Sequence, residues 1–437
     1  MRSFTSISLA ATAFIGTVAA ATSGSISLLT MNVAGLPEAL QGNDVPGDKA
    51  TNARQIGTYF AQYNYDIIHI QEDFNYHAHI YATDSHPYRT ATSGGVPFGS
   101  GLNTLSNNWW FDFRRIKWNK CSNASGADCL TPKGFTFMRM HIDDGVYVDV
   151  YNLHADAGTE SDDLSARASN IQQVADYISY WSEGNAVIVM GDTNTRYSRT
   201  GDNIRVLMTQ NNLSDAWIVR ERGGVVPTQE SLCNNPSLVN SCEIVDKILF
   251  RGNAITSLDA TFFNYESSKF LQPDGNILSD HNPITVDLAW KSSATRRQSD
   301  FWGGPHGDWF NDLGSLGDNP KTRIITFSGA SRLDSVGLTL TSGTRFSHGG
   351  SGGTQVSLTL DASEYWVSAK LCQSKHNNTT RIFYIQATTS TGRTLASGAQ
   401  TGECVIYSAP SGWQIVGYIG QSVDEVDLLG FIYAPQI

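Results

Sequence analysis

Up to about residue 290, the chain alternates between short apolar runs and longer segments that favour helices. The apolar runs 67–70 and 186–190 are typical of buried strands. A helix candidate precedes each of them: 53–63 before the first, and 163–181, with apolar residues at helical spacing, before the second. Strands linked by helices in this way predict a layered α/β sandwich.

From Phe301 onwards the pattern changes. Short strand-like runs are separated by Gly, Ser and Asn turns, and no convincing helical spacing interrupts them. This pattern predicts an all-β domain of sandwich or prism type. The polar segment 292–300 lacks periodicity, so we expect a linker there, between a first domain of about 22–291 and a second of 301–437.

The N-terminus has the features of a secretory signal at residues 1–20. Arg2 supplies the positive charge, 7–15 the apolar region, and Val18-Ala19-Ala20 a cleavage site of small residues. The apolar region is too short for a transmembrane anchor, and no later stretch approaches the roughly 20 residues that one needs. We therefore expect a secreted chain that begins near Ala21.

The cysteines agree with an oxidising compartment. Six cysteines in a secreted chain suggest three disulfides, for which 15 pairings exist. Their clustering favours local pairs within the sets Cys121 and Cys129, Cys233 and Cys242, and Cys372 and Cys404. Glycosylation sequons, which predict a glycoprotein, begin at Asn123, Asn212, Asn377 and Asn378.

The charge of the chain disfavours one class of partner. The formal net charge is −11, and no basic run is longer than Arg114-Arg115 or Arg296-Arg297. Non-specific binders of duplex DNA usually present a basic face. This lowers the expectation of a nuclease, although a catalytic metal can neutralise phosphate locally.

Short polar motifs end several of the apolar runs in the first domain. Carboxylates, amides and histidines at strand ends are unusual as core, and they suit a site that holds a hard divalent cation and a phosphate. In chain order these residues are Asn32, Glu72, His154, Asp192 with Asn194, Asp246, and Asp280 with His281.

Two of these motifs suggest how metal and water would be held. Glu72 follows the strand 67–70, so its carboxylate can point out of the sheet edge as a metal ligand. Asp192 and Asn194 are two residues apart, so on an extended segment one can orient water while the other binds phosphate. A surface glutamate and an Asx turn are the structural alternatives.

The histidine motifs suggest how protons would move. His281 can take a proton from water near neutral pH, and Asp246 is a candidate to orient its ring. His154 ends a strand and is a candidate donor to a phosphoryl oxygen. For both histidines the alternative is a structural role in the core.

Together, over residues 25–290, these motifs resemble the endonuclease/exonuclease/phosphatase superfamily of metal-dependent phosphoesterases. The resemblance implies a four-layer α/β sandwich with the site at the sheet edge. It implies Mg²⁺ or Mn²⁺ held chiefly by Glu72, with Asn32 and Asp280 close by. It also implies that Asp192 and Asn194 position water and phosphate. His281, paired with Asp246, would be the general base, and His154 would stabilise the phosphoryl charge.

Other segments resemble the neutral sphingomyelinase branch of that superfamily. They are Gly99-Ser-Gly-Leu102, the cysteines 121 and 129, and Lys133-Gly134-Phe135. The resemblance implies a secreted hydrolase of the phosphodiester in a lipid headgroup. A secreted Mg²⁺-dependent nuclease or phosphatase on the same residues is the alternative. The membrane-inserting hairpin of bacterial members is not evident between Asp246 and Asp280.

Residues 301–437 resemble a jacalin-type lectin domain, an all-β prism. The resemblance rests on Phe301-Trp-Gly-Gly304, His348-Gly-Gly-Ser-Gly-Gly353 and Gly420-Gln-Ser-Val-Asp424. It implies that glycans are partners and that the sugar lies at Gly304, Ser422, Val423 and Asp424. Two alternatives remain: a domain that only stabilises or spaces the enzyme, and a chain that acts primarily as a carbohydrate-binding lectin.

Overall fold

The structure is a computed structural model that describes residues 21–37, 44–93 and 99–437. The signal segment expected at 1–20 lies outside the described residues. No helix of the described part is long and apolar enough to cross a membrane.

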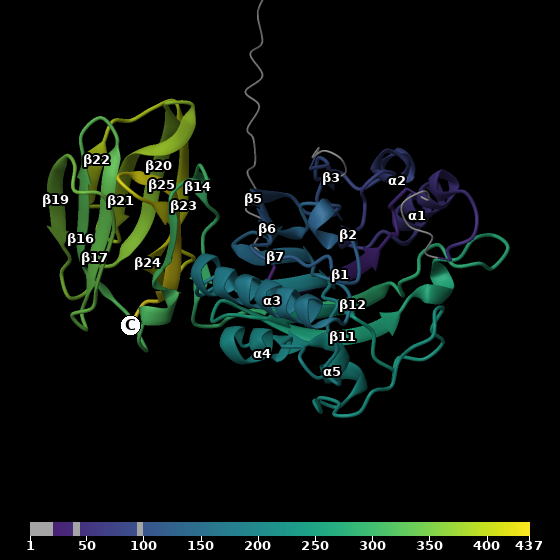
Figure 1. Ribbon diagram of the computed structural model, residues 1–437. Helices are drawn as coiled ribbons and strands as arrows, with labels where there is room; N and C mark the ends of the chain where they lie inside the picture. Colours follow the sequence, from purple (N-terminus) through teal and green to yellow (C-terminus); the bar gives the residue numbers. More distant parts are fainter. Residues whose placement is uncertain (1–20, 38–43, 94–98) are drawn as a thin grey trace, which may run out of the picture.

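Two six-stranded sheets form the first domain (Figure 1). The first sheet has the order β11 (Thr256–Tyr265), β12 (Ile284–Ser292), β1 (Ser23–Asn32), β2 (Ile67–Gln71), β4 (Asn103–Ser106), β3 (Tyr88–Arg89). The second has the order β5 (Trp110–Lys117), β6 (Gly134–Asp143), β7 (Val146–His154), β8 (Ala186–Asp192), β10 (Asp246–Arg251), β9 (Ser214–Asp215).

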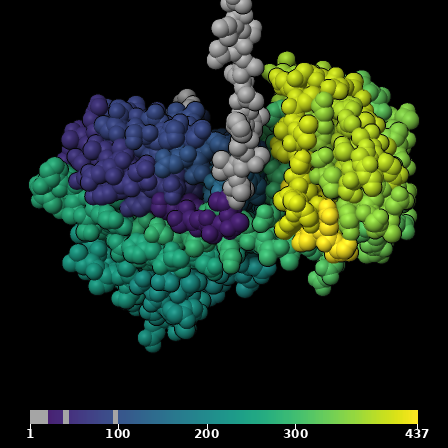
Figure 2. All heavy atoms as spheres, turned by 180° about the vertical axis from the view of Figure 1, so that it is seen from behind, coloured from purple at the N-terminus to yellow at the C-terminus, as the bar shows by residue number. Residues whose placement is uncertain are grey.

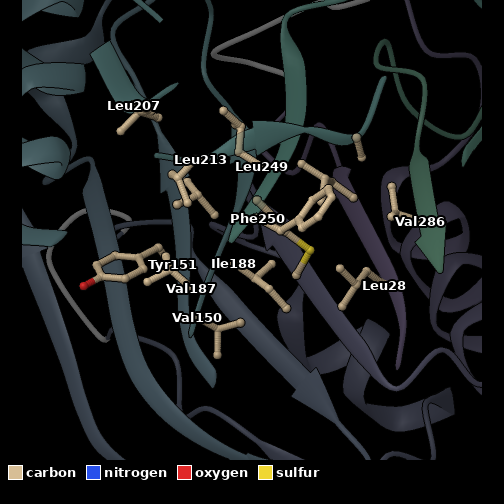
Figure 3. Close-up of a cluster of buried hydrophobic side chains, with 14 of the residues drawn as sticks. Leu28, Val150, Tyr151, Val187, Ile188, Leu207, Leu213, Leu249, Phe250 and Val286 are labelled. Carbon is tan, nitrogen blue, oxygen red and sulfur yellow. The ribbon is translucent and has the colours of Figure 1, made fainter. Parts of the chain in front are cut away.

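Helices cover the outer faces, which completes four layers, as the sequence predicted. The helices are α1 (Lys49–Tyr63), α2 (His77–Thr83), α3 (Ser161–Trp181), α4 (Arg205–Asn211) and α5 (Ala216–Glu221). Adjacent residues of β1 show the layering, because Leu28 belongs to the cluster that includes Val150 of β7 whereas Leu29 packs with Phe60 of α1. Figure 3 shows Leu28 and Val286 of the first sheet facing Ile188 of the second.

Local signals explain where the two long helices begin and end. Asp48 caps α1 by accepting a hydrogen bond from Thr51 N, and Asn64 ends it in the left-handed conformation. Glu160 and Asp163 form a capping box at the start of α3. The sequence placed both helices within a few residues of these bounds.

Strand direction brings the polar motifs to one edge of the sandwich. β1 and β2 are parallel, with Asn32 opposite Gln71, so Glu72 follows directly at the same edge. β7 and β8 are also parallel, with His154 opposite Asp192. β10 runs antiparallel to β8 and begins at Asp246, which lies opposite Asp192.

The C-terminal domain is a β-prism of three sheets around a shared core that includes the buried Trp366. One sheet holds β13 (Arg297–Gln298), β25 (Val426–Pro435), β24 (Trp413–Ser422) and β15 (Asp308–Asn311), with β14 (Trp302–Gly303) paired to β25. The second holds β18 (Arg345–Gly349), β17 (Leu333–Leu340), β16 (Thr322–Gly329) and β19 (Thr354–Thr359). The third holds β22 (Thr394–Gly398), β21 (Thr379–Thr389), β20 (Trp366–His376) and β23 (Glu403–Ser408).

The prism forms a lobe beside the sandwich (Figure 2), and the two domains touch through specific contacts. The Trp309 indole donates to the Glu183 carbonyl at 3.2 Å, just beyond the end of α3. Gln421 of β24 donates to the Asp112 carboxylate of β5 at 2.9 Å. Within the segment expected as a linker, β13 pairs with β25 of the prism.

Three disulfides confirm the local pairing expected from the sequence. They join Cys121 to Cys129, Cys233 to Cys242, and Cys372 to Cys404. The first two close loops of the sandwich domain, and the third links β20 to β23 in the prism.

Candidate active site

Asp192 lies at the centre of the polar cluster at the sheet edge. Its Oδ2 accepts a hydrogen bond from Asn32 Nδ2 at 3.2 Å, and it lies 3.4 Å from His154 Nε2 and 3.7 Å from His281 Nε2. The Asp192 side chain is buried, and burial, followed by the charge of Asp246, raises its pKa. Four motifs distant in the sequence therefore converge on one carboxylate.

His281 and Asp246 form the pair that the sequence suggested. His281 Nδ1 lies 2.8 Å from Asp246 Oδ2, which leaves Nε2 facing the centre of the site. Burial alone would lower the pKa of His281, but the carboxylates of Asp246 and Asp192 outweigh it and hold the pKa well above its usual value. The backbone N–H of His281 donates to Ser279 Oγ at 3.1 Å, which fixes the loop.

Glu72 is presented by an unusual backbone turn after β2. Its φ is 56°, and its carbonyl accepts a hydrogen bond from Gly35 N at 3.0 Å. A Cβ atom at Gly35 would lie 2.3 Å from that carbonyl oxygen, so the close approach requires glycine. Burial raises the pKa of Glu72 against the opposing charges of Lys133 and His281.

The oxygen atoms around Glu72 fit a hard divalent cation. Asp280 is exposed at the mouth of the site, and its charge also raises the pKa of Glu72. A divalent ion bound between such carboxylates would relieve that repulsion. Asp192, Asp246 and His281 also bring ligand atoms within 4.8 Å of one another, but both His281 nitrogens already face these carboxylates, which suits proton transfer better than metal binding.

Asn194 is held beside Asp192 by the end of a neighbouring strand. Its backbone N–H donates to Asp192 Oδ1 at 3.0 Å, and its Nδ2 donates to the Ala155 carbonyl at 3.1 Å. Its φ is 49°, a left-handed conformation that asparagine tolerates well. The structure thus combines the Asx turn considered from the sequence with a place in the site.

Lys133 is a site residue that the sequence analysis quoted only as part of a motif. Its Nζ lies 3.1 Å from His154 Nε2 and forms an ion pair with Asp128. Burial, followed by the charge of Lys133, holds the pKa of His154 well below its usual value, so this ring is neutral. Lys133 is only 8% exposed, and the sequence offered no signal for its role beyond the Lys133-Gly134-Phe135 motif.

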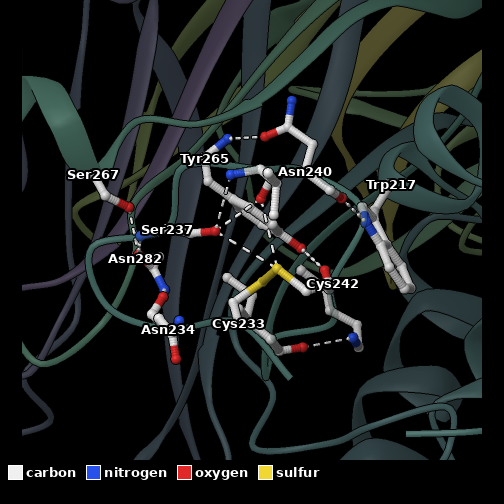
Figure 4. The surroundings of a disulfide bond; sticks show 12 residues. Trp217, Cys233, Asn234, Ser237, Asn240, Cys242, Tyr265, Ser267 and Asn282 are labelled. Atoms are coloured by element: carbon white, nitrogen blue, oxygen red, sulfur yellow. Dashed lines mark hydrogen bonds between the residues drawn. A yellow bond between two sulfur atoms is a disulfide. The ribbon is translucent and has the colours of Figure 1, made fainter. Parts of the chain in front are cut away.

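The Cys233–Cys242 loop supports the segment that carries Asp280 and His281. In Figure 4, Ser237 lies beside Asn282, and the Ser237 N–H donates to Asn282 Oδ1 at 2.9 Å. A cavity of about 240 Å³ opens between this loop and the catalytic segment, lined by Leu232, Asn235, Asp280, His281 and others. The cavity gives a ligand access to the cluster.

Three of the four residues expected at the sugar lie in one turn of the prism. Ser422 ends β24, and Val423 and Asp424 are exposed in the turn before β25. A Cβ atom at Gly350 would lie 2.2 Å from the Asp424 carbonyl oxygen, so a glycine-rich loop abuts this turn. Gly304 is buried and donates its N–H to the Asp427 carbonyl at 2.9 Å.

Comparison with known proteins agrees with both domains. Residues 44–217 match the model of endonuclease/exonuclease/phosphatase family 2, and 299–432 match that of the jacalin-like lectin domain. A sphingomyelinase of Mycobacterium tuberculosis is 36% identical over 283 residues, which cover 63% of this chain and 55% of that relative. The chain thus spans about half the length of these curated relatives.

Two solved structures are similar to one domain each. Sphingomyelinase C of Streptomyces griseocarneus is 18% identical with a TM-score of 0.43, covering 60% of this chain and 99% of that one. A mannose-binding jacalin-related lectin of Ananas comosus is 20% identical with a TM-score of 0.28, covering 32% and 97%. The chain therefore contains a domain that matches the endonuclease/exonuclease/phosphatase family, followed by a jacalin-like lectin domain.

Proposed function

We propose that this chain is a secreted, Mg²⁺-dependent phosphodiesterase of sphingomyelinase type whose lectin domain binds glycans. The observation that carries the enzymatic part is the His281–Asp246 pair, at 2.8 Å, facing Asp192 at one open sheet edge. Glu72 and Asp280 supply hard oxygen ligands beside it. The 36% identity to a sphingomyelinase supports the lipid branch.

In this proposal each group has one step in hydrolysis. A divalent cation held by Glu72, with Asn32 and Asp280 close by, would neutralise the phosphoryl oxygens and offset the carboxylates around His281. Asp192 orients the attacking water, and His281 Nε2 accepts its proton while Asp246 holds the imidazolium.

Three further groups hold the phosphate during this step. Asn194 positions the phosphate beside the water. His154 and Lys133, whose side chains approach to 3.1 Å, stabilise the developing charge on the phosphoryl oxygens. The charge of a buried lysine interacts more strongly with phosphoryl oxygens than that of a lysine in solvent, because less water screens it.

Exposed aliphatic side chains near the two disulfides of the sandwich favour a lipid over a nucleic acid. Leu238 and Val239, on the Cys233–Cys242 loop, are 86% and 57% exposed, and Leu130, beside the Cys121–Cys129 disulfide, is 66% exposed. Leu232, which lines the site cavity, is 44% exposed. Exposed aliphatic side chains of this kind suit contact with acyl chains, whereas a phosphate backbone would favour cations.

Glu72→Gln is expected to lower hydrolysis of sphingomyelin vesicles by roughly 100-fold or more and to weaken Mg²⁺ binding, because the amide keeps the shape but loses the charge of the metal ligand. Phosphocholine release with Mg²⁺ or EDTA, and Mg²⁺ calorimetry, measure the two effects. The Glu221→Gln variant, changed at the exposed end of α5, serves as the control and should match the parent.

The same assay separates the enzymatic alternatives when plasmid DNA and a generic phosphomonoester are run in parallel. Full turnover by Glu72→Gln would show that Glu72 is not the metal ligand. Plasmid cleavage without lipid turnover by the parent chain would make it a nuclease, and turnover of the monoester alone would make it a phosphatase.

Asp424→Ala is expected to abolish glycan-array binding while sphingomyelin turnover stays at the parent level. The exposed carboxylate accepts hydrogen bonds from sugar hydroxyls in this proposal, and it lies outside the catalytic cluster. Asp361→Ala, another exposed carboxylate of the prism, is the matched control. Unchanged glycan binding by Asp424→Ala would move the sugar elsewhere, and no binding by the parent would leave the domain a structural role.

A further inference from the structure

A second group of metal-ligating side chains lies at the junction of the two domains. His141 is near the end of β6, Asp144 is in the turn before β7, and Asp300 precedes β14. His141 Nε2 lies 4.0 Å from Asp144 Oδ1 and 3.8 Å from Asp300 Oδ1, and all three ligand atoms lie within 4.8 Å of one another. None of these residues belongs to the candidate active site.

Neighbouring groups hold these side chains in place. The Tyr147 hydroxyl and the Gly145 N–H donate to Asp300 Oδ1 at 3.0 and 2.9 Å. Burial, and then the charge of Asp300, raises the pKa of Tyr147 well above its usual value, so the hydroxyl keeps its proton. The Trp109 ring stacks on His141 with 4.7 Å between centroids. Outer contacts that orient ligands in this way are typical of metal sites.

A cavity beside the two carboxylates contains a polar group that needs a partner. The cavity has a volume of about 230 Å³ and is lined by Asp144, Asp300 and Gln298, among others. Gln298 is only 8% exposed, and among the described residues its Nε2 has no hydrogen-bond partner. A buried amide left unpaired is costly, so a small rotation of Gln298 toward an acceptor oxygen in the cavity, such as water bound to an ion, would be favourable.

The charges around the cluster also favour a cation. The ion pairs of Asp144 and Asp300 among the described residues are with His141 alone, and that histidine is charged only when protonated. Arg297 lines the cavity too, but its guanidinium lies over the Trp413 ring, 4.9 Å from the centroid. Two carboxylates therefore share one titratable partner.

We propose that His141, Asp144 and Asp300 bind a divalent transition-metal ion that ties the β6–β7 hairpin to the first residues of the lectin domain. One imidazole and two carboxylates suit Zn²⁺ or Mn²⁺, whereas Mg²⁺ prefers oxygen alone. Two ligands at about 2.1 Å from an ion in tetrahedral geometry lie about 3.4 Å apart. The observed separations of 3.8 and 4.0 Å need only small side-chain movements to close.

The bound ion acts as a clamp because its ligands come from both sides of the junction. Asp300 sits between β13 and β14, which both pair with β25 of the prism, whereas His141 and Asp144 belong to the sandwich. An ion that binds only when the two domains are docked stabilises the docked state by mass action. It leaves the catalytic cluster untouched.

The experiment uses the full chain stripped of metal with EDTA and then desalted, with Zn²⁺ as the probe. His141→Gln and Asp144→Asn are each expected to bind one Zn²⁺ fewer per chain than their parent, in both the wild-type and Glu72→Gln backgrounds. At a Zn²⁺ concentration of about 100 times Kd, the parent should gain roughly 3–6 °C in Tm, and both variants should lose that gain. Co²⁺ should also quench part of the tryptophan fluorescence in the parent, and that part should be lost in both His141→Gln and the parent changed at Trp109→Phe.

Two features keep the outcome clear. Asp144 has a side chain that is 70% exposed, so its substitution is not expected to disturb the fold, and His376→Gln in β20 controls for loss of any histidine. Zn²⁺ counts and Tm gains in His141→Gln and Asp144→Asn that equal those of the parent would overturn the proposal. Loss in these two variants, with His376→Gln unchanged, supports it.

Discussion

His281→Asn is expected to lower kcat for phosphodiester hydrolysis by about 1,000-fold while leaving the fold intact. An asparagine amide can reproduce the bond that His281 Nδ1 makes to Asp246, but it has nothing at the position of Nε2, which faces Asp192 at 3.7 Å. Removing Nε2 removes the proton acceptor alone. The measurement is kcat and KM on sphingomyelin vesicles, with Tm and Mg²⁺ affinity recorded on the same samples.

The partner of the histidine provides the internal control. Asp246→Asn should also lower kcat, because the amide no longer stabilises the imidazolium or fixes the ring. The double variant should lose little more than His281→Asn alone, because groups that act as one unit are strongly non-additive. Additive losses in the double variant, or a His281→Asn enzyme with kcat near that of the parent, would contradict the assignment.

The position of the site was predictable because it follows from strand order and direction. The apolar runs 67–70 and 186–190 had to be buried strands, and the polar residues directly after them had to meet once the strands lay parallel to their neighbours. Lys133 was harder to predict, because an isolated lysine before a strand is usually solvated. Its place beside His154 depends on the loop closed by Cys121 and Cys129, which no local pattern describes.

Short edge strands of the prism are harder to predict from the sequence than the strands inside its sheets. β18, β22 and β23 lie at the edges of their sheets and are five or six residues long. Edge strands bury less apolar surface than central ones, so their hydrophobic periodicity is weaker. β17 and β21 lie inside the same sheets and place apolar side chains in the core.

The junction between the domains was also beyond the sequence, since it rests on single contacts between distant residues. The Arg139 guanidinium carbon lies 3.4 Å from the centroid of the Trp309 ring, and its Nη1 reaches both oxygens of Asp149 at 2.9 and 2.8 Å. Its Nε lies 3.5 Å from Asp112, the carboxylate that accepts the Gln421 bond from the prism. Arg139 is only 1% exposed, and the sequence gives no hint of which partner covers it.

Arg139→Met is expected to destabilise the whole chain by about 3–5 kcal/mol, because it leaves buried carboxylates without their cation. Burial raises the pKa of Asp149, and the Arg139 charge opposes that rise. Arg139 therefore stabilises the ionised form of the Asp149 carboxylate. For a chain of 437 residues that unfolds as one unit, the loss corresponds to a fall in Tm of roughly 3–6 °C, measured by calorimetry. Arg114→Met, in which the lost side chain is 27% exposed, is the matched control and should cost below about 1 kcal/mol.

Adding Asp149→Asn to Arg139→Met tests whether the loss of stability comes from an unpaired carboxylate. If the cost comes from a carboxylate left unpaired, the neutral amide should restore part of the stability, because breaking a buried pair is costlier than replacing both partners. No recovery would place the cost in lost packing against Trp309 instead. In either case, Arg139→Met should split one cooperative transition into two, since the guanidinium contacts strands of the sandwich and an indole of the prism at once. A single transition at the parent Tm would show that the domains are held by other contacts.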